Sequence, residues 1–552
     1  MGLFRKKRRG MSKAPARSSA KRNYARVKAA ASVSAGSAKP AESAKPAESA
    51  KPAESAKPVE SAKTAAYERD HVSAERVFEF FRAISAIPHG SFHTKEISDY
   101  LVSFAEERGL ECVQDEAFNV IIRKKASEGY ENAEPIALQG HMDMVLACSP
   151  DKEMDMLTEA VTILEDGDWM FADGTTLGAD NGIAVAMMLA VLDDDSIVHP
   201  PIECIFTSDE EVGLIGATAI DLKDLQSRRL LNLDSESEGV FCAGCAGGGE
   251  VVADMPVKYK NRNGRRLNIR ISGLTGGHSG AEIHFGRANG IRLMARLLYK
   301  VYEACPFHLI SLSGGDADNA IPTYASAQIQ FKPVVDSGMI DSVISDYTAV
   351  LTSEFRITDP GIQWDTEWEP ACREKSMSAG RTLHLLRFLM ALPTGITHMN
   401  PELKGMPQTS LNLGVISTDE EKMRTVFMVR SGVNTQADYL MDRLISITEG
   451  FGGSAQVKSS YPAWEYRDDS PLRDLAVRTY QKMTGSAPVI EVIHAGLECG
   501  ILSGKRPDLD CLSIGPNLEN VHTIRERMSI SSVENVWAYL LLLLSEAARE
   551  SR

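Results

Sequence analysis

The chain is poor in cysteine and has no long apolar run. Nine Cys among 552 residues are few, and an odd number does not suit a disulfide scaffold. No segment approaches the ~18–20 consecutive apolar residues that span a bilayer. Residues 1–30 lack the apolar stretch of a secretory signal. We therefore expect a reduced, cytoplasmic protein without a membrane span.

Charge is divided unevenly along the chain. The net charge is −15, yet residues 1–66 contain 16 Lys and Arg against four Glu. The remainder, with 44 basic and 71 acidic residues, is too acidic to favour nucleic-acid binding. The hexapeptide Pro-Ala-Glu-Ser-Ala-Lys repeats from Pro40, Pro46 and Pro52 and offers almost no apolar side chain to bury. We expect residues 1–66 to be a disordered, basic, low-complexity tail, whose basic start leaves organelle targeting open.

The periodicity of apolar residues predicts an α/β fold. Helical spacing covers residues 73–87 and 94–108, and residues 182–192 read as a buried helix. Between them lie short apolar runs typical of strands, at residues 120–122, 135–138, 202–207 and 229–233. This alternation predicts a mixed, mostly parallel sheet flanked by helices.

The pattern of apolar and charged residues changes near residue 247. Strands that mix basic and apolar residues, such as 267–271, then alternate with helices such as 290–304. The last ninety residues return to short apolar strands and end on a Leu-rich helix over 533–547. We expect one domain made of residues 67–246 and 462–552, interrupted by an α+β domain of residues 247–461.

Polar residues follow the apolar strands of the first domain. Ligands gather at the carboxyl ends of strands in open α/β sheets, so these positions are candidates for chemistry. The candidates are His141, Asp143, Asp180, Glu210, Glu211 and Asp234. A set of His and carboxylate donors without thiolates suits Zn²⁺, Mn²⁺ or Co²⁺ in a catalytic site. Asp143, two residues from His141, is placed to orient that imidazole or a neighbouring site residue.

Longer motifs give this sequence a family resemblance. The relevant strings are His141-Met142-Asp143, Leu177-Gly178-Ala179-Asp180-Asn181-Gly182, Glu210-Glu211, Asn232-Leu233-Asp234-Ser235-Glu236 and Gly276-Gly277-His278-Ser279-Gly280. They resemble the di-zinc metallopeptidases that include glutamate carboxypeptidase and the carnosinases. Cys245-Ala246-Gly247-Gly248, His494-Ala495-Gly496-Leu497-Glu498-Cys499-Gly500 and Ser513-Ile514-Gly515-Pro516 resemble its aminoacyl-histidine and cytosol non-specific dipeptidase branch. The resemblance covers about residues 70–550.

The resemblance implies two divalent metal ions, zinc or alternatively manganese or cobalt. Asp180 would bridge them, with His141 and Asp234 at one ion and Glu211 and a late histidine at the other. His522 opens His-Thr-Ile-Arg-Glu, which keeps the His and Glu of the family's His-Ser-Pro-x-Glu motif but not its Ser-Pro. We assign His522 as the ligand and give His494 to the substrate pocket.

The resemblance also implies the remaining roles. Glu210 would be the general base, Asp143 would orient the His141 side, and a cis peptide bond would follow Asp180. The inserted domain would be a lid, in which His278 donates to the substrate carbonyl.

Two further lid positions match the family in their local motifs. Asn319 stands in Gly-Gly-x-x-x-Asn-Ala-Ile-Pro, and Arg430 in Val-Arg-Ser. The resemblance places both against the substrate. The forked guanidinium of Arg430 suits the substrate carboxylate.

The implied activity is hydrolysis of Xaa-His dipeptides, such as carnosine or Gly-His, and of other unblocked dipeptides. Family members are often homodimers. Two alternatives stay open: deacylation of N-acyl amino acids on the same metal core, and a metal-free interaction protein that keeps the fold.

Overall fold

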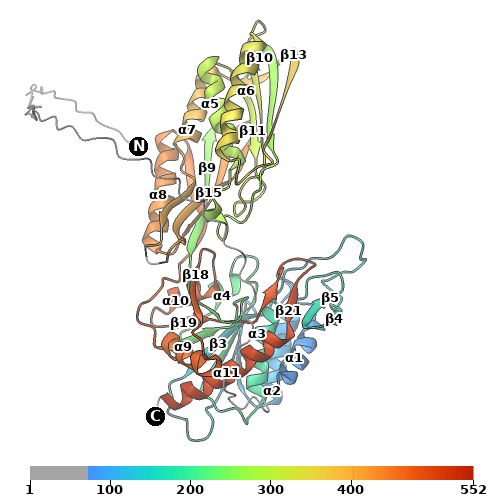
Figure 1. Ribbon diagram of the computed structural model, residues 1–552, viewed down its shortest axis with the longest axis vertical. Coiled ribbons are helices and arrows are strands. Elements are labelled where there is room, and N and C mark those ends of the chain that lie inside the picture. Colours follow the sequence, from blue (N-terminus) through green and yellow to red (C-terminus); the bar gives the residue numbers. More distant parts are fainter. Residues whose placement is uncertain (1–72, 402, 551–552) are drawn as a thin grey trace, which may run out of the picture. The chain divides into compact units, whose positions relative to one another are not determined.

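The computed structural model describes residues 73–401 and 403–550 (Figure 1). The tail expected over residues 1–66 lies outside these ranges. Within them, every helix is too short or too polar to cross a bilayer.

The first sheet has eight strands in the order β1-β2-β6-β3-β7-β19-β8-β18. Their bounds are β1 Glu111–Gln114, β2 Val120–Lys124, β3 Ile136–His141, β6 Ile202–Thr207, β7 Arg229–Asn232, β8 Val240–Cys245, β18 Val489–Ile493 and β19 Asp510–Ser513. β3 pairs in parallel with both β6 and β7, β7 with β19, and β8 with β18. The β1–β2, β2–β6 and β19–β8 pairs are antiparallel. This arrangement confirms the predicted mixed, mostly parallel sheet.

Helices cover both faces of this sheet because its central strands are apolar on both sides. Ile136 and Leu138 pack into one core, whereas Ala137 between them packs into another, as the alternation of side chains in a strand requires. The helices are α1 Glu75–Ser85, α2 Lys95–Glu107, α3 Ala179–Asp193, α9 Pro471–Thr484 and α11 Ile530–Glu550 around the first core, and α4 Ile215–Ala219 and α10 Glu498–Lys505 around the second.

The second sheet is antiparallel and runs β13-β10-β12-β11-β15-β16-β9-β17, with β14 beside β15. The strands are β9 Gly247–Pro256, β10 Tyr259–Ser272, β11 His308–Gly314, β12 Ala325–Phe331, β13 Gln363–Met377, β14 Gly395–Met399, β15 Pro407–Thr418, β16 Lys422–Ser431 and β17 Ser454–Tyr461. The helices are η1 Ile283–Phe285, α5 Gly290–Ala304, α6 Ser337–Glu354, α7 Ala379–Ala391 and α8 Asn434–Gly450.

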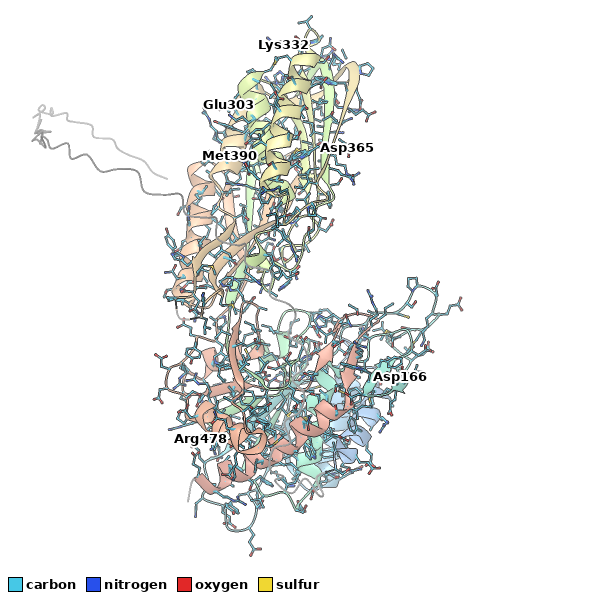
Figure 2. All side chains as sticks on the ribbon, viewed as in Figure 1. Asp166, Glu303, Lys332, Asp365, Met390 and Arg478 are labelled. Atoms are coloured by element: carbon cyan, nitrogen blue, oxygen red, sulfur yellow. The ribbon has the colours of Figure 1, made fainter. Side chains whose placement is uncertain are left out.

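Helices α5 to α8 bury the apolar face of the second sheet (Figure 1). Leu267, Ile269 and Ile271 of β10 belong to that core, while Arg270 between them is exposed. Polar side chains such as Lys332 and Asp365 stand on the surface of this part (Figure 2). Since strands of the first sheet come from residues 111–245 and 489–513, and those of the second from 247–461, the topology supports our proposal of an interrupted domain with an insert.

A third, small sheet brings the late histidine segment to the first domain. Its order is β20-β21-β5-β4, with β4 Ile163–Asp166, β5 Trp169–Ala172, β20 Leu518–Glu519 and β21 Arg527–Ser529. β21 pairs with β5, so Met528 lies opposite Met170. The loop between β20 and β21 contains His522 and therefore lies beside the chain that leads into α3.

Candidate metal centre

The candidate ligands meet at one edge of the first sheet. His141 is the last residue of β3, and Glu210 and Glu211 follow the end of β6, while Asp234 follows β7. Because these strands are parallel neighbours, their carboxyl ends lie at the same edge. Asp180 lies in the first turn of α3, where its φ and ψ are not helical and its bond to Asn181 is cis, as the resemblance implied.

Asp180 stands between the two histidines. Its Oδ1 lies 3.2 Å from His141 Nε2 and its Oδ2 lies 3.2 Å from His522 Nε2. His141 Nε2 is also 3.5 Å from Asp234 Oδ1, and His522 Nε2 is 2.9 Å from Glu211 Oε1. The sets His141–Asp180–Asp234 and Asp180–Glu211–His522 each have ligand atoms within 4.8 Å of one another. The two sets share Asp180, the geometry of a bridged pair of sites.

The donor set fits two divalent cations. Glu211 Oε1 is buried and accepts no hydrogen bond from the described residues, although His522 Nε2 is only 2.9 Å away. Two atoms that converge without bonding are arranged as ligands of a common ion. Imidazole and carboxylate donors without thiolate suit zinc and its first-row neighbours.

The electrostatics of the centre also favour positive charge. Burial raises the pKa of Asp234 to about 6 and that of Glu236 to about 7, because charged carboxylates crowd there without solvent. The carboxylates of Asp180 and Glu211, whose nearest oxygens lie 3.2 and 2.9 Å from His522 Nε2, raise the pKa of His522 to about 11. These carboxylates stabilise a proton on the histidine, and a metal cation binding there takes the proton's place.

Asp143 organises the loop that carries Glu210. Its Oδ1 accepts the Glu210 backbone N–H at 2.9 Å, and its Oδ2 accepts that of Glu211 at 3.3 Å. Its main-chain oxygen lies 3.0 Å from His141 Nδ1 and its Oδ1 lies 3.4 Å from the same nitrogen. Asp143 thus contacts both His141 and the Glu210–Glu211 backbone.

Glu526 was noted in the sequence only as part of a motif. Its carboxylate accepts four backbone N–H groups, from Leu177, Gly178, Ala179 and Asp180, at 2.7 to 3.2 Å. Glu526 therefore fixes the loop that presents Asp180. Its place four residues after His522 was the available signal, but no motif in the sequence indicated its partner.

Glu498 is a second acid with no role assigned from the sequence. It is fully buried, and its Oε2 accepts hydrogen bonds from Gln139 Nε2 at 2.5 Å and Thr207 Oγ1 at 2.6 Å. Its Oε1 has no hydrogen-bond partner in the part of the chain that the structure describes, and burial raises the pKa of Glu498 to about 7. Gln139 belongs to β3 and Thr207 ends β6, so Glu498 joins the two strands that present His141 and Glu210.

Three of the four expected substrate residues gather in a second cluster. A Cβ at Gly280 would lie 2.4 Å from the His494 oxygen, 2.9 Å from His278 Cε1 and 3.0 Å from Arg430 Nε, so Gly280 sits among the three. His494 Nε2 lies 2.7 Å from Ser410 Oγ. Arg430 Nη1 donates a hydrogen bond to the Tyr461 hydroxyl at 3.0 Å. Arg430 Nε is buried and has no hydrogen-bond partner within residues 73–401 and 403–550.

Asn319 lies beside His278. Its side chain is exposed, its main-chain oxygen accepts the Ser279 N–H at 2.8 Å, and it lines with His278 a cavity of about 320 Å³. In the part of the chain that the structure describes, no hydrogen bond or ion pair links these four residues to the candidate metal ligands.

Comparison with known proteins places the chain in a family. Residues 137–546 match the model of peptidase family M20/M25/M40. The chain belongs to this family. This M20 peptidase is 34% identical over 484 residues to the cytosol non-specific dipeptidase of Escherichia coli, covering 87% of this chain and 99% of that one. The crystal structure of an aminoacylhistidine dipeptidase from Vibrio alginolyticus matches with a TM-score of 0.78 and 34% identity, over 86% of this chain and 96% of that chain. The resemblance and the fold class expected from the motifs are confirmed.

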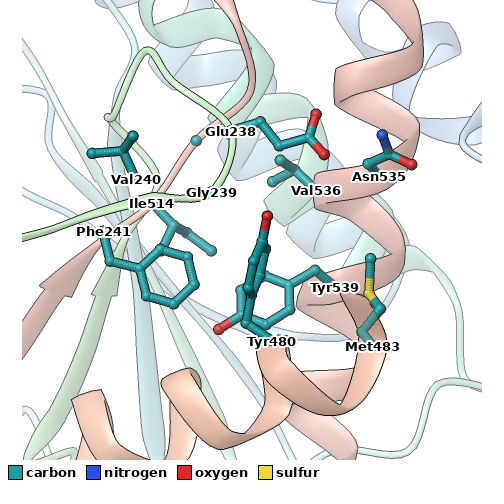
Figure 3. A pocket seen from close by; sticks show the side chains of 11 residues that line it. Glu238, Gly239, Val240, Phe241, Tyr480, Met483, Ile514, Asn535, Val536 and Tyr539 are labelled. Carbon is teal, nitrogen blue, oxygen red and sulfur yellow. The ribbon is translucent and has the colours of Figure 1, made fainter. Parts of the chain in front are cut away.

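A further cavity in the M20 peptidase is unrelated to the metal centre. It lies among Phe241, Tyr480 and Tyr539, near Glu238 (Figure 3). Its volume is about 10 Å³, enough for about one water molecule. A peptide cannot enter it.

Proposed function

We propose that this M20 peptidase is a metal-dependent dipeptidase that hydrolyses unblocked dipeptides, Xaa-His among them. The observation that carries the proposal is the sharing of Asp180 between two ligand sets, which fits a hydrolytic two-metal site. The names of the two relatives at 34% identity, a cytosol non-specific dipeptidase and an aminoacylhistidine dipeptidase, support the substrate class.

We propose His141 and Asp234 as ligands of one ion, Glu211 and His522 of the other, and Asp180 as the bridge. When bound, such ions polarise the scissile carbonyl and lower the pKa of water. We favour zinc, with manganese and cobalt as alternatives.

Glu210 moves the proton. Burial raises the pKa of its carboxyl well above the usual value, which makes the carboxylate a stronger proton acceptor than an exposed glutamate. It takes a proton from the attacking water and delivers it to the leaving amine. Asp143 holds the Glu210 backbone through the 2.9 Å bond and keeps the base in place.

His278 donates to the carbonyl oxygen as negative charge develops there. Its Nδ1 accepts the Ala281 N–H at 3.0 Å, so in the neutral ring the proton is on Nε2. Burial and the nearby Arg430 lower the pKa of His278, which favours this neutral form.

Arg430 binds the substrate carboxylate. The tyrosine hydroxyl occupies Nη1, which leaves the buried Nε and the adjacent Nη2 as a two-donor edge for a carboxylate. His494 is uncharged here, because burial lowers its pKa to about 3, so it contributes a hydrogen-bonding ring beside the guanidinium. Asn319 adds an amide on the His278 side.

The test is turnover of Gly-His, carnosine and N-acetyl-histidine by the purified chain, with and without a chelator. We expect cleavage of the two dipeptides, loss of activity with the chelator, and recovery with Zn²⁺, Mn²⁺ or Co²⁺. Faster cleavage of N-acetyl-histidine than of either dipeptide would contradict the proposal in favour of a deacylase. We also propose a cytoplasmic homodimer, which light scattering and fractionation would check.

A further inference from the structure

A phenylalanine occupies an unfavourable position in the loop between α1 and α2. Residues 90–93 form a turn in which the His93 N–H donates to the Gly90 oxygen at 2.8 Å. Phe92, the third residue, has φ +66°, where Gly or Asn is normally favoured. Its side chain is 68% exposed, so burial of the ring does not compensate for the backbone conformation.

The turn is attached to the loop that carries Glu210. The Phe92 N–H donates to Asp209 Oδ1 at 2.7 Å, and Asp209 directly precedes Glu210. The neighbouring Ser91 hydroxyl donates to Asp143 Oδ2 at 2.8 Å, on the carboxylate that also holds the Glu210 backbone. Phe92 is therefore held beside the proposed general base by two bonds from its own turn.

A second exposed apolar residue is attached to the same aspartate. The Ile215 N–H donates to the Asp209 main-chain oxygen at 3.1 Å, and 38% of Ile215 is exposed. Its neighbour Leu214 also has a positive φ, +59°. We name Phe92 and Ile215 the Asp209 wall. Both apolar side chains are solvent-exposed, and both backbones are bonded to Asp209, the residue before Glu210.

We infer that the Asp209 wall contacts the N-terminal side chain of the substrate and selects apolar residues there. The inference rests on the proposed dipeptidase function. Arg430 of the inserted part takes the carboxylate at one end of a dipeptide, and the scissile carbonyl lies at the metal centre. The N-terminal residue lies on the opposite side of the scissile carbonyl from that carboxylate, and its side chain then contacts Phe92 and Ile215, whose backbone N–H groups are bonded to the residue before Glu210. Contact with an apolar side chain removes both surfaces from water.

The experiment varies the N-terminal residue at constant C-terminal residue. kcat/KM is measured for Leu-His and Gly-His, and for Gly-Leu as the C-terminal counterpart, in the wild type, Phe92→Gly and Phe92→Tyr. Tyr439→Ala is the control, because Tyr439 is an aromatic residue of α8 that is 56% exposed and has no part in the site.

We expect Phe92→Gly to lower the Leu-His to Gly-His ratio of kcat/KM about 10-fold, the scale of a lost apolar contact in a specificity pocket. Gly-His and Gly-Leu should change little, and Phe92→Tyr and Tyr439→Ala should keep the wild-type ratio. The melting temperature of Phe92→Gly should be unchanged or higher, since Gly adopts φ +66° without strain. That combination separates a substrate contact from a structural role.

Other results would overturn the inference. Equal losses on Leu-His and Gly-His would make Phe92 a support of the Glu210 loop, and a selective loss on Gly-Leu would put the wall at the other substrate residue. A changed oligomeric mass of Phe92→Gly with unchanged ratios would make the ring a contact between copies. A wild type that cleaves no dipeptide would overturn the proposed function together with the wall, whereas an active wild type with unchanged ratios in the variant overturns the wall alone.

Discussion

Glu526 accepts the backbone N–H of Asp180 at 3.2 Å, although 346 residues separate them. The same carboxylate accepts three more N–H groups from the preceding residues. Since His522 lies four residues before Glu526, one segment supplies both a proposed metal ligand and the support of the bridging aspartate.

Glu526→Ala should therefore weaken metal binding without removing a ligand. Four backbone N–H groups, three of them buried, lose their acceptor, and each buried unsatisfied group costs about 1–3 kcal/mol unless water replaces it. We expect a lower melting temperature and lower affinity at both metal positions, measured by calorimetry and metal titration. Glu519→Ala is the control, because Glu519 is exposed and pairs with Arg527. Wild-type metal affinity in Glu526→Ala would contradict the supporting role.

Substitutions of the neighbouring residues Glu210 and Glu211 should lower activity for different reasons. Glu210→Gln keeps the size and removes the base, so kcat should fall by about 10²–10⁴-fold with metal content near wild type. Glu211→Gln weakens a ligand, so its activity should recover partly as metal is added. Metal titration of the two variants makes the comparison. Rescue of Glu210→Gln but not of Glu211→Gln would reverse the assignment.

The two late histidines give a matched pair of variants. His522 Nε2 lies 2.9 Å from Glu211, whereas His494 Nε2 lies 2.7 Å from the Ser410 hydroxyl. His522→Ala should lose bound metal, and His494→Ala should keep it and show a higher KM. Elemental analysis of the purified variants measures the difference. Metal loss in His494→Ala alone would transfer the ligand role to that residue.

Arg430→Ala should impair dipeptides with a free carboxylate selectively. The Nε of Arg430 is buried and has no partner among the residues described, and a C-terminal amide offers it no charged partner. We expect KM to rise more for Gly-His than for Gly-His amide. Arg424→Ala on the same strand is the control, because Arg424 pairs with Asp254. Equal effects on both substrates would remove Arg430 from carboxylate binding.

Glu498 should affect turnover through Gln139 and Thr207. Glu498→Ala removes the buried acceptor that both side chains share between the strands that present His141 and Glu210. We expect kcat of Glu498→Ala to fall while its metal content and KM stay near wild type. Glu498→Gln should restore part of the lost kcat, because an amide oxygen can still accept a hydrogen bond. Loss of kcat that Gln does not rescue would indicate that the acid itself is required.

The secondary structure near the site followed closely from local sequence. The helices predicted over 94–108 and 290–304 are found at Lys95–Glu107 and Gly290–Ala304, because apolar spacing and end signals are local. The α3 start differed: the helix was predicted from residue 182, whereas the structure begins it at Ala179 with non-helical angles at Asp180 and Asn181.

The sequence by itself determined which residues could hold metal and that a mostly parallel sheet would carry them. Polar residues that directly follow apolar strands are expected at one edge of the sheet, because parallel strands all have their carboxyl ends at that edge. Only the tertiary structure decided how those residues meet. The β21–β5 pairing brings His522 to Asp180, the Glu526 carboxylate fixes the Asp180 loop, and Glu498 joins β3 to β6. These contacts join residues hundreds of positions apart. Long-range hydrogen bonds leave no periodic signal in one sequence, so the supports of the site emerge only when the chain is folded.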